Sequence, residues 1–93
     1  MASETCIRLV IHGSVQGVGF RFAACEAASE CSVRGWVRNL ADGSVEIVAQ
    51  GSPDAVARMA AWAERGPRHA AVARVQVEAL ARSSTLEAFE IRR

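Results

Sequence analysis

The order in which apolar periodicities change along the chain constrains its fold more than any other feature. Alternating apolar residues over Ile7 to Gly13 predict a strand, and apolar residues at three-residue spacing from about Arg21 to Cys31 predict a helix. Alternation returns over Val33 to Asn39 and over Ser44 to Gln50. The Asp-Gly pair within residues 40–43 is typical of a hairpin turn between two strands. The predicted order of the first half is therefore strand, helix, strand, strand.

The second half adds a helix and two strands. Ser52 is placed to cap the helix, and Gly66-Pro67 is typical of a helix end. Alternation over Ala73 to Ala79 predicts a fourth strand, and Leu86 to Arg92 predicts a short last one. This order is that of the split βαβ, or ferredoxin-like, plan. We therefore expect an α+β sandwich: an antiparallel sheet with two helices on one face.

The helix and strand patterns also predict which side chains form the core. In the first helix, Phe22, Cys25 and Ala28 are expected to make the buried stripe. In the fourth strand, Val75 and Val77 are expected to face inward. The other residues expected to point inward or to form an apolar helix face are Val45, Ile47, Ala49, Val56, Met59, Ala60 and Ala63. Three further sets are each expected to share one face of their strand: Ile7, Leu9 and Ile11; Val33, Val37 and Asn39; Phe89 and Ile91.

Length, composition and charge exclude several classes of protein. A chain of 93 residues buries roughly 60–65% of its unfolded surface, enough for one two-layer core, so residues 1–93 are expected to form a single domain. A hydrophobic fraction of 51% is ordinary for a soluble globule. The formal net charge of +1 argues against a nucleic-acid surface. Without an apolar run of membrane length or a signal peptide, we expect no membrane partner and a cytoplasmic location. A monomer is the simplest expectation.

The cysteines do not predict a metal or redox motif. Cys6, Cys25 and Cys31 form no C-x-x-C pair, and buried free thiols are the expected state in a reducing cytosol. A bridge between Cys6 and Cys31 stays open, because an antiparallel helix would bring both to the same end of the molecule. His12 and His69 are expected at the surface, with no metal ligands around them.

A glycine-rich segment before the first helix predicts an anion site. Gly13, Gly17 and Gly19 separate the first strand from the helix, and Arg21 stands where that helix begins. A helix N-terminus already carries about half a positive charge, so a cation there is favourable only if an anion lies nearby. The guanidinium fork and loop N–H groups together suit a phosphate. The alternative is an ordinary glycine turn with a solvent-facing arginine.

Asn39 is the second candidate, at the end of the predicted second strand. Its amide oxygen could accept a proton from a water, and its NH2 group could donate to an anion. Asparagine is also common as a cap before a hairpin turn, and that reading stays open. Trp36 is expected to cover the open face of the sheet, with the side-chain stems of Arg34 and Arg38 packed over it.

Taken together, the two segments make the chain resemble the acylphosphatase family. One family signature matches IHGSVQGVGFR at residues 11–21, and a second matches GWVRN at residues 35–39 with Gly43, Val45 and Gly51 after it. The resemblance implies that Arg21 binds phosphate and that Asn39 positions the attacking water. It also implies that backbone groups cradle the phosphate along Val15, Gln16, Gly17, Val18, Gly19 and Phe20. Leu86 replaces a frequent tyrosine of the family, and Arg68-His69 stands where a second proline is common.

The function implied by this resemblance is hydrolysis of the carboxyl–phosphate bond of an acyl phosphate. The products would be a carboxylate and inorganic phosphate, and phosphate should inhibit; no metal and no cofactor are implied. Two alternatives stay open: a non-catalytic ferredoxin-like binding module, and a domain that handles carbamoyl phosphate within a larger protein. The chain has no exposed aromatic pattern of an RNA-recognition strand and no metal-carrier C-x-x-C loop.

Overall fold

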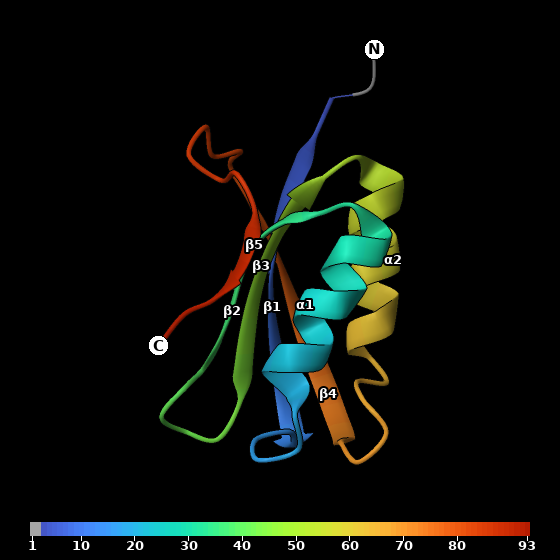
Figure 1. Ribbon diagram of the computed structural model, residues 1–93, viewed down its shortest axis with the longest axis vertical. Helices are drawn as coiled ribbons and strands as arrows, with labels where there is room; N and C mark the ends of the chain where they lie inside the picture. Colours follow the sequence, from blue (N-terminus) through green and yellow to red (C-terminus); the bar gives the residue numbers. More distant parts are fainter. Residues whose placement is uncertain (1–2) are drawn as a thin grey trace.

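A computed structural model describes residues 3–93 and shows two helices packed on one face of a five-stranded sheet (Figure 1). The elements in chain order are β1 (Thr5–Ser14), α1 (Phe20–Cys31), β2 (Arg34–Asn39), β3 (Val45–Gly51), α2 (Pro53–Ala63), β4 (Ala71–Leu80) and β5 (Phe89–Ile91).

The sheet has the strand order β4-β1-β3-β2-β5. The first four strands are antiparallel to their neighbours, while β5 runs parallel to β2, so the complete sheet is mixed. This topology confirms the predicted ferredoxin-like plan. The last strand is shorter than Leu86 to Arg92, because only residues 89–91 reach β2 and pair with it.

Helix α1 buries only part of the predicted stripe: Ala28 is buried and Cys25 is partly buried against the core, but Phe22 is not. Phe20 and Ala24 are 2% and 0% exposed, whereas Phe22 is 78% exposed, so its predicted burial is wrong. The helix begins at Phe20, whose ring packs edge-to-face on Trp62 of α2 with centroids 5.3 Å apart. Ala24, Ala27 and Ala28 follow at helical spacing and complete the buried face. With Phe20 on the core, a residue two positions later must point away.

The edge strand β4 shows the second departure. Val77 is 62% exposed, so its predicted inward burial is wrong, while Val75 is half-buried against the core. Helix α2 packs over β1 and β3, which leaves this part of the edge strand without a covering layer. Val75 and Val77 thus share one face of β4 as predicted, but alternation alone does not show whether a helix covers that face.

The open face of the sheet is built around a buried carboxylate. Glu46 on β3 is 4% exposed and is hydrogen-bonded by Arg8 of β1 and Arg38 of β2. The guanidinium groups of Arg38 and Arg92 lie 5.0 and 5.1 Å from the centre of the Trp36 ring. Arg38 thus covers Trp36 as predicted.

The guanidinium of Arg34 has partners other than the Trp36 ring. Its guanidinium forms a bidentate pair with Glu4 and its Nε donates to the carbonyl of Leu86. The Glu4 carboxylate offers a matching fork of acceptors and so fixes the guanidinium end of this side chain.

Glu46 makes the stability of the fold sensitive to acid. Burial alone raises the pKa of this carboxyl, but hydrogen bonds from Arg8 and Arg38 and their charges outweigh burial and lower it overall. A lowered folded-state pKa stabilises the protein above the unfolded value, about 4.3 for glutamate, and this stabilisation is lost as the pH falls through the folded value. In urea titrations, Glu46→Gln should therefore lose less unfolding free energy than wild type between about pH 5 and pH 3.

The matched control is Glu30→Gln, which alters an exposed carboxylate on α1 and should keep the wild-type acid dependence. Glu4 and Asp42 also have lowered pKa values, through hydrogen bonds from Arg34 and from Ser44 respectively, so only part of the acid dependence should disappear. If the unfolding free energies of wild type and Glu46→Gln fell equally as the pH is lowered, the role assigned to this carboxylate would be contradicted.

Candidate active site

Sheet topology brings the two predicted segments together. Strands β1 and β2 both pair antiparallel with β3, on either side of it, and Val45 of β3 is aligned with Ile11 on one side and Asn39 on the other. Asn39 and Ile11 are therefore about two strand spacings apart, roughly 10 Å. Figure 1 shows the loop after β1 and the turn after β2 at the same end of the molecule.

Gly13 permits the close pairing with β4 at the end of β1. It has φ 132° and lies where the pairing between β1 and β4 shifts register. A Cβ atom here would lie 2.2 Å from the carbonyl oxygen of Ala71, so no larger residue fits. The register shift therefore lies at Gly13, one residue before the end of β1, where Gly13 and Ser14 still pair with Val72 and Ala71, and such irregularities are common near functional sites.

Gly17 and Gly19 serve the loop in another way. Both are left-handed, with φ 76° and 77°, yet a Cβ atom at either would meet nothing within 4 Å. Backbone conformation, rather than lack of space, requires glycine at these two positions. Within the described part of the chain, the N–H groups of residues 16–19 donate no hydrogen bond to the protein. These donors are available to a ligand.

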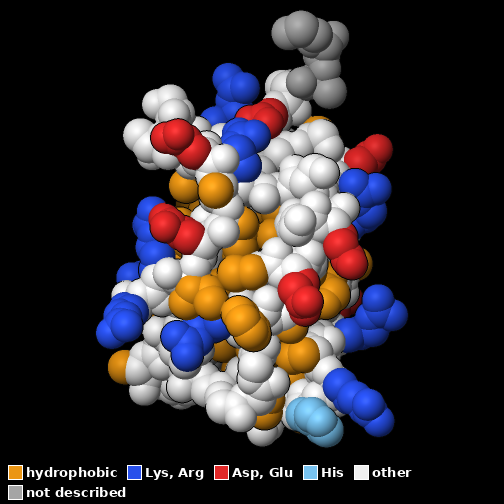
Figure 2. Space-filling model, in the orientation of Figure 1, with side chains coloured by type: hydrophobic (Ala, Val, Ile, Leu, Met, Phe, Trp, Pro, Cys, Tyr) orange, Lys and Arg blue, Asp and Glu red, His pale blue; other side chains and the backbone are white. Residues whose placement is uncertain are grey.

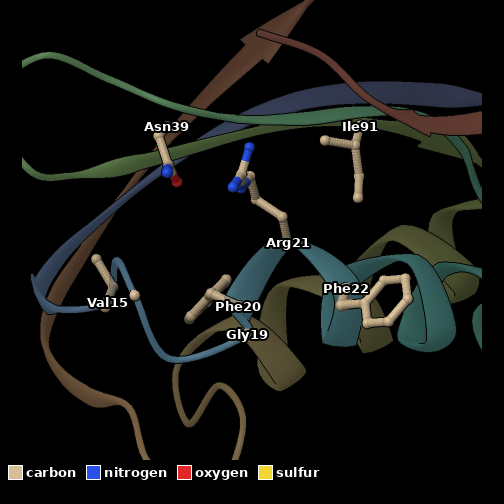
Figure 3. A pocket seen from close by; sticks show the side chains of 8 residues that line it. Val15, Gly19, Phe20, Arg21, Phe22, Asn39 and Ile91 are labelled. Atoms are coloured by element: carbon tan, nitrogen blue, oxygen red, sulfur yellow. The ribbon is translucent and has the colours of Figure 1, made fainter.

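The start of α1 is electrostatically positive. Gly19 caps the helix without a side-chain hydrogen bond, and the first turn carries no acidic residue. In the structure as described from residue 3 onward, Arg21 makes no salt bridge, whereas the sheet arginines Arg8, Arg34 and Arg38 pair with carboxylates. Figure 3 shows the guanidinium of Arg21 extending toward Asn39. A cation and an uncapped helix start on one side of a hollow favour an anion there.

The hollow is a pocket of about 280 Å³. Its lining residues are Val15, Gly17, Gly19, Phe20, Arg21, Phe22, Asn39 and Ile91. Six of the predicted site residues are thus brought together, while the predicted loop members Gln16 and Val18 do not line the pocket. Phe22 and Ile91 line it and were not predicted. Ile91 could not be found from the sequence, because only the parallel pairing of β5 with β2 brings it here.

Gln16 has a structural contact that its sequence position did not indicate. Its Nε2 donates to the carbonyl oxygens of Leu40 and Ser44, at 2.8 and 2.9 Å. Both carbonyls belong to the hairpin that follows Asn39, and the N–H of Leu40 also donates to Ser44 at 2.8 Å. Gln16 therefore ties the glycine loop to the hairpin whose first strand ends in Asn39.

The remaining candidate groups lie apart from this pocket. His12 contacts Gln76 through its ring Nε2, 2.7 Å from Oε1. Cys6, Cys25 and Cys31 are free thiols, and burial raises the pKa of the first two. Over residues 3–93, no three His, Cys, Asp or Glu side chains gather in a way that could hold a metal ion. In the same range, no helix is both long and apolar enough to cross a bilayer.

Comparisons with known proteins agree with the fold and with the family that the sequence resembles. A family model described as Acylphosphatase matches residues 7–91. The chain is 48% identical over 88 residues to a protein named acylphosphatase from Nitrosococcus oceani, covering 95% of this chain and 98% of the relative. It is 44% identical over 92 residues to another from Anaeromyxobacter dehalogenans, covering 99% of each. The solved structure of an acylphosphatase from Coxiella burnetii matches with TM-score 0.90 at 39% identity, covering 96% of this chain and 93% of that one.

Proposed function

The chain belongs to the acylphosphatase family and is an acyl-phosphate hydrolase, and we propose that Arg21 and Asn39 carry the reaction. The substrate is an acyl phosphate, RCO–OPO3²⁻. Water attacks phosphorus, the P–O bond to the carboxyl group breaks, and the products are RCOO⁻ and H2PO4⁻. The carboxylate is a stable leaving group, so the reaction needs little acid catalysis.

Arg21 and the glycine loop hold the phosphoryl group. Charge in the transition state is spread over three equatorial oxygens, and a planar guanidinium with several N–H donors matches that distribution. The free N–H groups of residues 16–19 and the uncapped start of α1 supply the remaining donors. Inorganic phosphate presents the same oxygens, so it should bind competitively.

Asn39 orients the attacking water. It extends from the end of β2 across the pocket from the loop, with its amide near the guanidinium of Arg21 (Figure 3). Its amide oxygen accepts a hydrogen bond from the water and so aims a lone pair at phosphorus. Gln16 supports this placement, because it ties the loop that holds the phosphate to the hairpin that follows Asn39.

The observation that carries this proposal is the convergence of Arg21, the glycine loop and Asn39 on one pocket. We expect the purified protein to release phosphate from acetyl phosphate in the presence of a chelator, at a rate proportional to enzyme concentration and competitively inhibited by inorganic phosphate. A colorimetric phosphate assay, corrected for spontaneous hydrolysis, measures both.

The same assay separates the alternatives. A non-catalytic binding module would bind phosphate without turnover. Hydrolysis of carbamoyl phosphate with no turnover of acetyl phosphate would indicate the carbamoyl-phosphate role instead. Full loss of activity on chelation, restored by added metal, would contradict the metal-independent mechanism.

A further inference from the structure

The edge strand β4 leaves a long row of backbone groups open to pairing. Its 10 residues pair with β1 on one side, and in the described part of the chain no strand lies against the other side (Figure 1). The opposite edge of the sheet is formed by β5, which has only 3 residues. Natural sheets protect an exposed edge with a short strand, proline or lysine, and β4 has none of these. Its outer edge can therefore accept another strand.

The sequence of β4 is symmetric in character about Gln76. Valine stands on each side of it, at Val75 and Val77, and the next residues outward, Arg74 and Glu78, carry opposite charges. In a symmetric dimer formed through antiparallel strands, residues at equal distances on either side of the two-fold axis are aligned. With the axis at Gln76, Arg74 of one copy is aligned with Glu78 of the second copy, and valine is aligned with valine.

Neighbouring registers lose this match. An axis at Val75 would align Arg74 with Gln76, and an axis at Val77 would align Glu78 with Gln76, so the two charges would not meet. An axis between two residues is incompatible with regular pairing, because alternate residues direct their N–H and C=O groups to opposite sides of a strand. The charges therefore favour the register centred on Gln76.

The two valines lie on the helix side of the sheet. They are aligned with Ile11 and Leu9 of β1, both of which are fully buried in the core. Val77 is nevertheless 62% exposed, because α2 packs over β1 and β3 and not over this part of β4. Pairing at the register centred on Gln76 would bring four valines of two copies side by side and cover this exposed surface.

The two charged side chains are available for pairing with a second copy. Arg74 makes no salt bridge within residues 3–93, and the carboxylate of Glu78 is 60% exposed and 3.4 Å from Nη1 of Arg8. Charges on an edge strand normally discourage pairing, but opposite charges placed symmetrically attract across antiparallel copies. The net charge is only +1, and Figure 2 shows side chains of both signs spread over the helix side of the molecule, so general repulsion between copies is small.

We propose that β4 is a self-association edge, at which two copies of this chain pair antiparallel about Gln76 to form one continuous sheet. Two-fold symmetry closes this interface, and the short β5 offers no second edge of the same kind, so the assembly stops at a dimer. One strand from each copy makes the contact, whereas stable interfaces bury roughly 1,200–2,000 Å² in total, so the dimer dissociates on dilution. The monomer expected from the sequence is then the form of the dilute protein.

Sedimentation equilibrium over a range of protein concentrations tests the proposal. Wild type should shift from monomer to dimer as the concentration rises, with no larger species. Arg74→Glu and Glu78→Arg each align like charges at two symmetric positions, and each should weaken dimerisation by about tenfold or more. An equimolar mixture of these two variants should dimerise as wild type does, because every charged pair across the strands is then again of opposite sign. A double variant that carries both changes in one chain should dimerise as well.

The matched control is Arg58→Glu, which makes the same change of charge at an exposed arginine of α2 and should leave dimerisation as in wild type. Circular dichroism checks that each variant is folded, as expected for substitutions of exposed side chains. A wild type that stays monomeric up to millimolar protein would overturn the proposal. Single variants that dimerise as tightly as wild type, or a mixture that associates no better than its components, would overturn it too.

Discussion

Replacing Arg21 by lysine should lower kcat/KM for acetyl phosphate by about 10³-fold or more, the effect of an arginine that stabilises a phosphoryl-transfer transition state. Lysine keeps the positive charge but presents a compact ammonium in place of a planar fork. It cannot contact two equatorial oxygens with the geometry that the guanidinium offers. The side chain is half-exposed and makes no salt bridge within the described chain, so the substitution should not disturb the fold.

Phosphate release gives kcat and KM for this variant, and thermal unfolding checks that it is folded. Arg58→Lys is the matched control, because Arg58 is an exposed arginine on α2 that does not line the pocket. It should retain wild-type kinetics. Near-normal turnover by a folded Arg21→Lys protein would show that charge alone suffices and would reject the assigned role.

Asn39→Ala should lower kcat about 10²-fold while the inhibition constant of phosphate stays close to that of wild type. The reason is that the amide positions water in the proposed mechanism, whereas Arg21 and the loop hold the phosphoryl group. Removing the amide leaves those ligands in place and loses only the alignment of the nucleophile. Asn39→Asp should differ, because a carboxylate beside the bound anion repels it and should weaken phosphate inhibition.

The pair of measurements distinguishes two roles for Asn39. Loss of phosphate binding in Asn39→Ala would mean that the side chain is a ligand of the anion and not the group that orients water. Gln76→Ala serves as a control for deleting an amide, since Gln76 is exposed on the edge strand β4 and contacts only His12 in the described hydrogen bonds. Its kcat should match that of wild type.

Local sequence rules were sufficient for much of this molecule. The cap at Ser52 is observed, with its Oγ accepting from the N–H of Ala55 at 3.1 Å, and the left-handed Gly66 follows the end of α2. Alternation in β1 correctly separates the buried Leu9 and Ile11 from the opposite face. These features depend on periodicity, caps and turns, which act within a few residues and are therefore visible in the sequence.

The errors share one cause. Phe22 and Val77 are apolar residues at positions that local periodicity placed inside, yet both are exposed. The phase of α1 is set by Phe20 packing on Trp62, more than forty residues away, and the cover over β4 depends on where α2 lies. The pairing of Arg34 with Glu4 was likewise not predicted, because Glu4 comes from a distant segment. Each outcome is decided by contacts between segments, which local patterns do not report.

The candidate site divides in the same way. The glycine loop, Arg21 and Asn39 could be identified from residue types and spacing, because left-handed turns require glycine and phosphate requires donors and positive charge. The tertiary structure decides that these residues meet in one pocket and that Phe22 and Ile91 also line it. It also decides the hydrogen bonds from Gln16 to the hairpin. The physical reason is that strand order and register place residues far apart in the chain side by side, and these are properties of the assembled sheet.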